Sequence, residues 1–415
     1  MRPVVVALAV TLAVQILTAT ALISPSVIAP AAAGDLGVAP QAIGLFVSIA
    51  YFAAMLSGLA TGGLIARFGA LAVCQGAVVI AGLGLALGKV ATLAMVPLVV
   101  SPLLVLVLAG LLVGAAYGLV NPVSSHILAR HTPPGAMALV FSIKQTGVPI
   151  GGAIAGAVVP TLVLVMGWPN ALPVLGAVCV LAAFALLPAR AVIADAPQAR
   201  EAAAARAPFA SRWRRALEGM IGPIRLALSQ PRLRDLAFVS LGYASAQLVF
   251  IAYFVSHLTL QLGLSLVTAG VVYAFGHGAG IVGRIVWGAV ADRWLAPRTT
   301  LAALGVVSAA CAALTALFSD AWPLAGVVAV ALLYGASAVG WNGVFLAEVA
   351  RSAPPGQVGA ATGGTQFFTF GGAMAGPPVF TALVSATGSY AWGFAFFALV
   401  PLVISLRLLA ARTAP

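Results

Sequence analysis

The chain has 415 residues, of which 62% are hydrophobic and 7% are charged, and its formal net charge is +12. A water-soluble fold of this length cannot hide so much apolar surface, so most of the chain must lie in lipid. In lipid the backbone must satisfy its own hydrogen bonds, which leaves helices or a closed barrel. The apolar segments run for about 20 residues without the alternation of barrel strands, so we expect an all-α membrane protein.

Twelve apolar segments are predicted to be transmembrane helices. In the first half they cover 4–24, 41–65, 70–88, 100–128, 137–165 and 168–188. In the second half they cover 235–258, 267–290, 300–318, 323–347, 359–387 and 390–410. The first segment resembles a secretory signal, but it is long for a signal core, and removing it would leave eleven spans. We therefore treat it as the first transmembrane helix.

The two halves of the chain repeat each other. Residues 129–135 read Ala-Arg-His-Thr-Pro-Pro-Gly, and residues 350–356, 221 positions later, read Ala-Arg-Ser-Ala-Pro-Pro-Gly. Asn121 and Asn342 stand at the same distance upstream of the two copies. An offset of about half the length indicates a duplication. We expect two six-helix bundles related by a pseudo-twofold axis, 1–188 and 235–415, with a substrate site between them.

The basic residues indicate the orientation of the chain. The central linker, 189–234, carries nine arginines opposed by only three acids, Asp195, Glu201 and Glu218. With twelve spans, Lys89 is the clear base on the side opposite the linker. Six further arginines fall on the same side as the linker: Arg67, Arg130, Arg293, Arg298, Arg351 and Arg412. The positive-inside rule then puts both termini and the linker in the cytoplasm, and we expect a bacterial inner membrane. The stretch around Trp213 is interpreted as a tether, with contact to anionic lipid as the alternative.

Two short loops carry a family resemblance. Residues 288–293 read Gly-Ala-Val-Ala-Asp-Arg after the eighth span, and 62–69 read Gly-Gly-Leu-Ile-Ala-Arg-Phe-Gly after the second. Both resemble the loop motif of the major facilitator superfamily, whose members are twelve-helix transporters. The resemblance implies that Asp292 caps or pairs with a neighbouring helix end, and that Asp292, Arg293 and Arg67 take part in gating. Ala66 replaces the aspartate in the first copy, so the aspartate's role is expected in the second half.

Arg284 lies inside the eighth span, roughly 12 Å along the helix from Asp292. A charge at this depth is costly, which favours a functional role. The segment 283–288 resembles that of oxalate/formate antiporters and monocarboxylate carriers, in which an arginine at this place binds the substrate carboxylate. A guanidinium fork matches a carboxylate well. An arginine bonded to carbonyls of a neighbouring helix is the alternative. His277 lies two turns earlier on the same face and is expected to assist.

Lys144 lies about seven residues into the fifth span, and it either supplies a second cation to the site or extends to the cytoplasm. The antiporters it is compared with use a lysine in span eleven, where this chain has Gln366. Aspartate and glutamate fall at the ends of the spans rather than in their middles, so buried bases without buried acids favour an anionic substrate. Each of the other polar residues in the spans could line the cavity or could instead form an interhelical hydrogen bond: Gln15, Tyr51, Asn121, His126, Gln145, Gln247, Tyr273, Asn342 and Gln366.

These observations predict a secondary transporter for a small organic anion, most simply a carboxylate, with a coupling proton or counter-anion. We expect a monomer without cofactor, metal site or nucleic-acid partner. An exporter of hydrophobic drugs is the alternative, using aromatic residues such as Phe250, Phe254 and Phe367. A membrane receptor that binds without transporting is less favoured because the linker is short. An enzyme is not expected, because the sequence shows no catalytic constellation, and Cys74, Cys179 and Cys311 lack metal or disulfide spacing.

Overall fold

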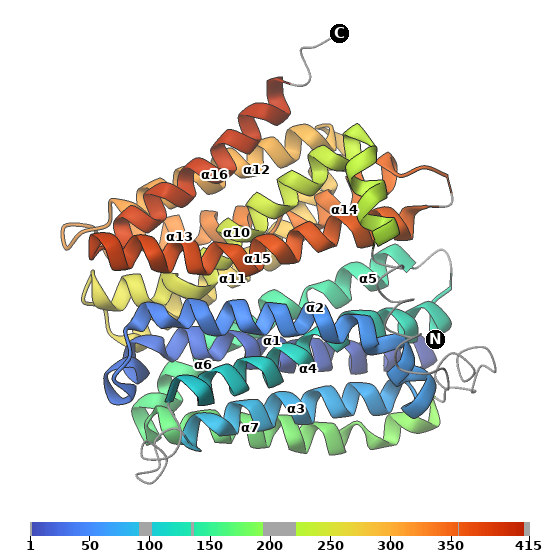
Figure 1. Cartoon of the computed structure of the whole chain (residues 1–415), viewed down its shortest axis with the longest axis horizontal. Helices are drawn as coiled ribbons and strands as arrows, with labels where there is room; N and C mark the ends of the chain where they lie inside the picture. The colour runs from blue at the N-terminus through green and yellow to red at the C-terminus, as the bar shows by residue number, and fades with distance from the viewer. Residues whose placement is uncertain (1, 91–101, 134–136, 194–220, 356, 411–415) are drawn as a thin grey trace. The chain divides into compact units, whose positions relative to one another are not determined.

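The computed structural model describes residues 2–90, 102–133, 137–193, 221–355 and 357–410 (Figure 1). These residues form helices and connecting turns, with no strand among them, and twelve helical stretches are long and apolar enough to cross a membrane. The expected all-α architecture and the number of spans are therefore confirmed for this part of the chain. Most of the expected linker, including Trp213, lies outside the described residues.

The first compact unit, unit 1, comprises Met1–Val38 and Ile49–Ala216. In it α1 packs along α6 and α4, while α3 packs along α4 and α7, as Figure 1 shows. A short 3₁₀ helix, Leu187–Ala191, follows the last of these helices. The helices are α1 (Arg2–Leu36), α2 (Ile43–Phe68), α3 (Ala70–Val90), α4 (Pro102–His131), α5 (Met137–Gln145), α6 (Gly147–Met166) and α7 (Trp168–Ala185).

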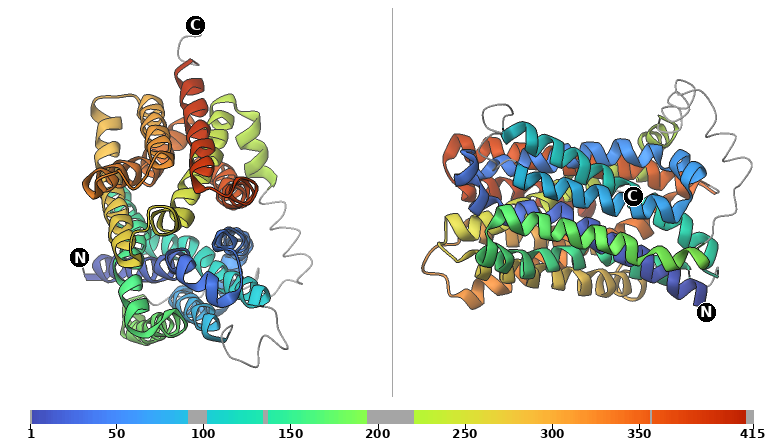
Figure 2. Two further views of the ribbon diagram at one scale, coloured as in Figure 1. Left: turned by 90° about the vertical axis from the view of Figure 1, so that its left-hand side faces the viewer. Right: turned by 90° about the horizontal axis from the view of Figure 1, so that it is seen from below.

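The second compact unit, unit 2, comprises Ala39–Ser48 and Leu217–Pro415. Its close helix pairs are α10 with α15, α12 with α16 and α11 with α13, and the left view of Figure 2 shows several of its helices nearly end-on. A 3₁₀ turn, Pro40–Ala42, and the start of α2 also belong here. The helices are α10 (Pro231–Leu260), α11 (Leu266–Arg293), α12 (Pro297–Ala316), α13 (Leu324–Ala338), α14 (Asn342–Ser352), α15 (Val358–Thr387) and α16 (Tyr390–Ala410).

Glycines set how closely the helices of each unit approach. A Cβ added at Gly335 of α13 would lie 1.8 Å from the carbonyl oxygen of Gly276 on α11. In unit 1 a Cβ at Gly114 of α4 would lie 2.0 Å from the carbonyl oxygen of Ala50 on α2. Any side chain at either position would therefore push the two backbones apart, and small residues at such crossings are typical of membrane helix packing.

Three spans differ from the sequence-based expectation. The fifth was expected to be one helix over 137–165, but α5 ends at Gln145 and α6 begins at Gly147. The first was expected to end at residue 24, yet α1 continues to Leu36, and Asp35 near its end accepts a hydrogen bond of 2.7 Å from Trp168 Nε1 at the start of α7. That contact fixes the additional turns to the neighbouring helix. The tenth span was expected to be one helix over 323–347, but it is divided into α13 and α14 by residues 339–341.

Candidate functional site

The break in the tenth span lies against the middle of α11. Arg284 Nε donates to the carbonyl oxygen of Val339 at 3.2 Å, and Trp287 Nε1 donates to that of Ala336 at 2.9 Å. Carbonyls at a helix C-terminus lack intrahelical donors, and a cation there also interacts favourably with the helix dipole. Arg284 thus makes the backbone contact that was the alternative interpretation of its role.

Gln247 on α10 reaches the other side of the same break. Its Oε1 accepts from Trp341 Nε1 at 3.1 Å and from Asn342 Nδ2 at 3.5 Å. Two neighbouring helices therefore hold the irregular residues between α13 and α14 in place. Of the residues expected to line a site, the structure brings Arg284 and Gln247 to this one break.

His277 and Tyr273 lie deeper along α11 and are fully buried. The Tyr273 hydroxyl donates to the carbonyl oxygen of Ile251 at 3.3 Å, and the His277 ring lies 4.5 Å from the Tyr273 ring and 6.1 Å from that of Phe250. Neither ring nitrogen of His277 has a hydrogen-bond partner among the described residues, and the Tyr334 hydroxyl likewise has none there. An unpaired buried polar group costs about 1–3 kcal/mol, so these groups lower the stability of the core around His277.

Lys144 in unit 1 points into the protein. Its side chain is only 2% exposed, and Nζ donates to Oδ1 of Asn121 on α4. This burial argues against the alternative in which the lysine extends to the cytoplasm. Gln145, the next residue, is partly exposed, as is Gln366 of α15 in unit 2.

Two further polar residues of unit 1 are of interest: Gln15, which the sequence offered only as one of several polar residues that could line a cavity, and Ser124, which sequence reasoning did not single out. Gln15 of α1 and Ser124 of α4 are both fully buried, and the amide of Gln15 and the hydroxyl of Ser124 have no hydrogen-bond partner in the described part of the chain. A glutamine within a long apolar run was the visible signal for Gln15. Ser124 offered no signal, because a serine in a membrane helix usually bonds to its own backbone.

The expected gating residues lie at exposed helix ends. Asp292 Oδ1 accepts a charged hydrogen bond of 2.8 Å from Arg351 Nη2 near the end of α14. Arg293 is exposed, and the Arg67 guanidinium lies 5.0 Å from the centre of the Phe68 ring. Pairing of Asp292 with a neighbouring helix end is what the family resemblance implies, while the gating role itself stays a prediction.

A second charged group at the ends of unit 2 was missed by sequence reasoning. Arg298 on α12 lies 3.1 Å from Glu348 of α14 and 3.9 Å from Asp235 of α10, measured between side-chain nitrogen and carboxylate oxygen. These three residues are far apart in the sequence, so no local motif could have indicated the contact. They tie three helices together where α10 and α12 begin and where α14 nears its end.

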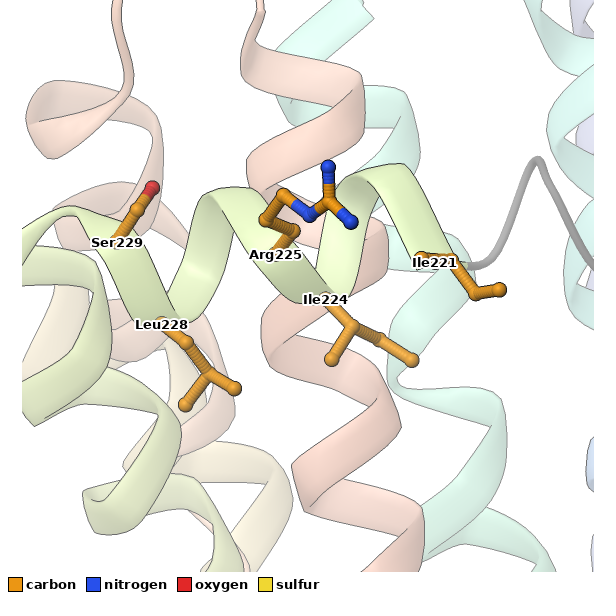
Figure 3. Close-up of a pocket in the computed structure, with 5 residues that line it drawn as sticks. All are labelled: Ile221, Ile224, Arg225, Leu228 and Ser229. Atoms are coloured by element: carbon orange, nitrogen blue, oxygen red, sulfur yellow. The ribbon is translucent and has the colours of Figure 1, made fainter.

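A cavity of about 470 Å³ lies along a short helix at 221–229, before α10. Figure 3 shows Arg225 and Ser229 on one side of this helix and Ile224 and Leu228 on the other. None of the expected site residues lines it. Among the described residues no group of three histidine, cysteine or acidic side chains could hold a metal ion, and the three cysteines are buried and not linked by disulfides.

The sequence pattern of the Major Facilitator Superfamily matches residues 10–377. The chain belongs to the major facilitator superfamily. No curated protein sequence matches it significantly. Its place in the superfamily establishes a membrane transporter with a small-molecule substrate and a lipid environment, and leaves the substrate class to be argued from the site.

Solved structures of transporters share the fold. A mutant of the nucleoside transporter NupG aligns with a TM-score of 0.71 at 16% identity, over 97% of this chain and 99% of that one. A bacterial homologue of the human lysosomal transporter Spinster, inward-facing and occupied, aligns at 0.67 and 16% identity, over 98% and 96%. A POT family transporter in complex with a thioalcohol-conjugated peptide aligns at 0.69 and 14% identity, again over 98% and 96%. At these identities the likeness concerns the fold alone.

Proposed function

We propose that this transporter moves a small organic anion, bound through a carboxylate, across a bacterial inner membrane by alternating access. The observation that carries the proposal is the burial of Lys144, whose ammonium group is held by the neutral oxygen of Asn121. Burying an ammonium ion costs several kcal/mol unless negative charge or hydrogen bonds compensate. A negatively charged substrate that reached this buried cation would gain a charge-assisted hydrogen bond.

Four of the five described carboxylates have partners near helix ends, and the fifth, Asp320, is exposed in the turn before α13. Asp35 accepts from Trp168, Asp235 and Glu348 lie beside Arg298, and Asp292 lies beside Arg351. The spans contain buried basic side chains, whereas the described acidic side chains lie at the helix ends or in a turn. This distribution favours an anionic substrate over a cationic one. The proposal keeps both termini in the cytoplasm, on the positive-inside rule, and a proton or a counter-anion as the coupling ion.

In this proposal Arg284 of unit 2 is a further substrate-binding cation. Its Nε–H donates to the carbonyl oxygen of Val339, and a guanidinium matches the geometry of a carboxylate. His277, Tyr273, Gln145, Gln247 and Gln366 are proposed to line the path or to shape it. Because a bond to Val339 orients the guanidinium, substrate binding at Arg284 would be sensitive to the break between α13 and α14.

The test is uptake of radiolabelled oxalate, formate and lactate into proteoliposomes by the wild type and by Arg284→Gln and Lys144→Gln. We expect each substitution to lower uptake of the transported anion at least tenfold, because each removes one positive charge from the site. Lys89→Gln is the matched control, since Lys89 also donates to an asparagine, Asn170, at 2.9 Å, but in an exposed position at a helix end. Undiminished anion uptake by both site variants would refute the proposal.

The alternative of a drug exporter depended on a set of aromatic side chains. Phe250 and Phe254 are fully buried, their ring centres lie 4.9 Å apart, and the Phe250 ring lies 4.7 Å from that of Tyr334. These rings build the interior of unit 2 instead of facing an opening within it. Phe367, the third residue named for a drug site, is partly exposed, so the preference for an anion depends on the buried bases and not on excluding every aromatic side chain.

A further inference from the structure

Four polar side chains from three helices gather inside unit 1. Lys144 of α5 donates to Asn121 of α4, and Ser124 lies one helical turn after Asn121 on the same face of α4. Gln15 comes from α1: a Cβ added at Gly147 would lie 2.8 Å from Gln15 Cγ and 2.9 Å from its Cβ. Gly147 follows Lys144 by three residues, and Thr146 between them has helical angles (φ −68°, ψ −15°). Gln15 and Lys144 therefore lie against the same face.

The hydrogen bonding of this group is incomplete. Gln15 and Ser124 are 0% exposed, yet Gln15 Nε2, Gln15 Oε1 and Ser124 Oγ have no partner among the described residues. Buried polar groups in native proteins are almost always paired, and exceptions mark a missing water, ion or ligand. A fully buried glutamine with both amide atoms unpaired, packed at Gly147 against the segment that carries the buried Lys144, indicates a place for a polar molecule.

Unit 2 offers a comparison for these positions. Asn342, the repeat counterpart of Asn121, donates to Gln247 of α10, and Gln247 also accepts from Trp341. There the glutamine amide oxygen has two protein partners and stands beside no lysine. In unit 1 the lysine takes the asparagine oxygen, and Gln15 has no described partner. The buried glutamine of unit 2 is thus hydrogen-bonded to protein groups, whereas the buried glutamine of unit 1 has no partner among the described residues.

The donors that are present select the ligand. Lys144 offers an ammonium group, Gln15 an N–H₂ group and Ser124 a hydroxyl, and a carboxylate has about four acceptor positions and no donor of its own. Asp35 of the same unit lies twenty residues beyond Gln15 on α1, roughly 30 Å along the helix, and accepts from Trp168. A metal cation would meet the like charge of Lys144. We infer that Gln15, Ser124 and Lys144 form the subsite for the substrate carboxylate, with Asn121 as the residue that positions the lysine.

This inference rests on the proposed function and goes beyond it, because it places the carboxylate inside unit 1 and adds two neutral donors. It also separates two kinds of residue. Lys144, Gln15 and Ser124 would contact the anion and set its affinity. Asn121 would act through Lys144, so Asn121→Asp should pair with the ammonium group and lower anion affinity while raising thermal stability.

The main experiment compares Gln15→Leu and Gln15→Glu in purified full-length protein, with oxalate, formate, acetate and lactate as probes and the neutral amides of the same acids as controls. Thermal unfolding is followed with and without each probe. We expect at least one acid, and none of its amides, to raise the unfolding temperature of the wild type. Gln15→Leu should retain the unliganded unfolding temperature but weaken the apparent affinity about tenfold. Ser124→Ala should weaken it severalfold.

The Gln15→Glu variant distinguishes a ligand-binding role of Gln15 from a purely structural one. Its carboxylate would lie beside Lys144 and occupy the subsite permanently, so the variant should unfold at a higher temperature and no longer respond to the acid. Gln75→Leu is the matched control, because Gln75 is a buried glutamine of the same unit whose amide does have partners, the Ala183 carbonyl at 2.8 Å and Arg190 at 3.2 Å. It should lower stability and leave the response to the acid unchanged.

The outcomes distinguish the two proposals. If no acid stabilises the wild type, both the proposed function and the subsite are wrong. If an acid stabilises the wild type and Lys144→Gln abolishes the effect, while Gln15→Leu, Gln15→Glu and Ser124→Ala all respond like the wild type, the function stands and the subsite is overturned. The cluster would then be a site for buried water.

Discussion

At the scale of single residues, the buried histidines of unit 2 show how pairing decides what a polar group contributes. His257 of α10 is 1% exposed, and its Nε2 lies 2.9 Å from the carbonyl oxygen of Thr315. His277 of α11 is 0% exposed, and neither of its ring nitrogens has a partner among the described residues. We therefore expect these two side chains of the same type and burial to contribute differently to the stability of the fold.

We predict that His277→Leu leaves the free energy of unfolding unchanged or raises it by about 1 kcal/mol, because an apolar group replaces an unpaired polar one. His257→Leu should lower it by about 1–2 kcal/mol, since it removes the bond to Thr315 at the end of α12. Thermal unfolding of both variants in the same detergent provides the comparison. An equal loss of stability in the two would show that His277 does have a partner in the folded protein.

The sequence identified some candidate site residues but not the contacts that these residues make. The position of Lys144 in an apolar span made it a candidate ligand but left open whether it extends to the cytoplasm, and only the structure shows its burial. Its partner does not follow from the sequence either, because Asn121 reaches Lys144 only through the packing of α4 against α5. Ser124 could not be identified from the sequence, because a sequence does not show whether a serine hydroxyl has a hydrogen-bond partner.

At the scale of elements, the break between α13 and α14 is the main departure from the expected helices. Its sequence is apolar throughout, and only Gly340 interrupts the helix propensity. The break is stabilised by side chains from elsewhere, Arg284 and Trp287 of α11 and Gln247 of α10. Hydropathy predicts how many residues cross the membrane, but it carries no information on carbonyls that are satisfied by a neighbouring helix.

Trp287→Phe tests whether α11 holds this break. The substitution keeps the ring and removes the indole N–H that bonds to Ala336, so we expect a loss of about 1 kcal/mol in stability and faster hydrogen exchange confined to the region around residues 336–345. Thermal unfolding and hydrogen-exchange mass spectrometry measure the two effects. Trp294→Phe is the control, since Trp294 is 77% exposed. Exchange that is equally slow in the two variants would mean that the break does not depend on the bond.

At the scale of the whole molecule, the duplicated halves differ in how their helix ends are charged. In unit 2 Asp292 pairs with Arg351, and Arg298 with Glu348 and Asp235. In unit 1 Ala66 takes the place of the loop aspartate, and Arg130 Nη1 lies 3.3 Å from His126 Nε2. The repeat could be predicted from the sequence because its motifs are copied. The difference in helix-end charge between the two halves was visible in the sequence only at Ala66, which replaces the loop aspartate.

The pair of Asp292 and Arg351 allows gating to be separated from stability. Both side chains are at least half exposed, and such a pair contributes only about 0–1 kcal/mol to folding. Asp292→Arg should therefore change the unfolding temperature very little. It should change the transport rate severalfold if the pair favours one state of the transport cycle, because even about 1 kcal/mol shifts a balanced two-state equilibrium about fivefold.

The double variant Asp292→Arg with Arg351→Asp restores the attraction with the charges exchanged, and we expect it to recover most of the wild-type transport rate. Rates in proteoliposomes and unfolding temperatures of the two single variants and the double variant complete the cycle. Recovery would show that the ion pair itself acts, because the two single losses would not then be additive. Rates that fall further in the double variant would assign the effect to each residue separately, and raising the salt concentration would then leave the wild-type rate unchanged.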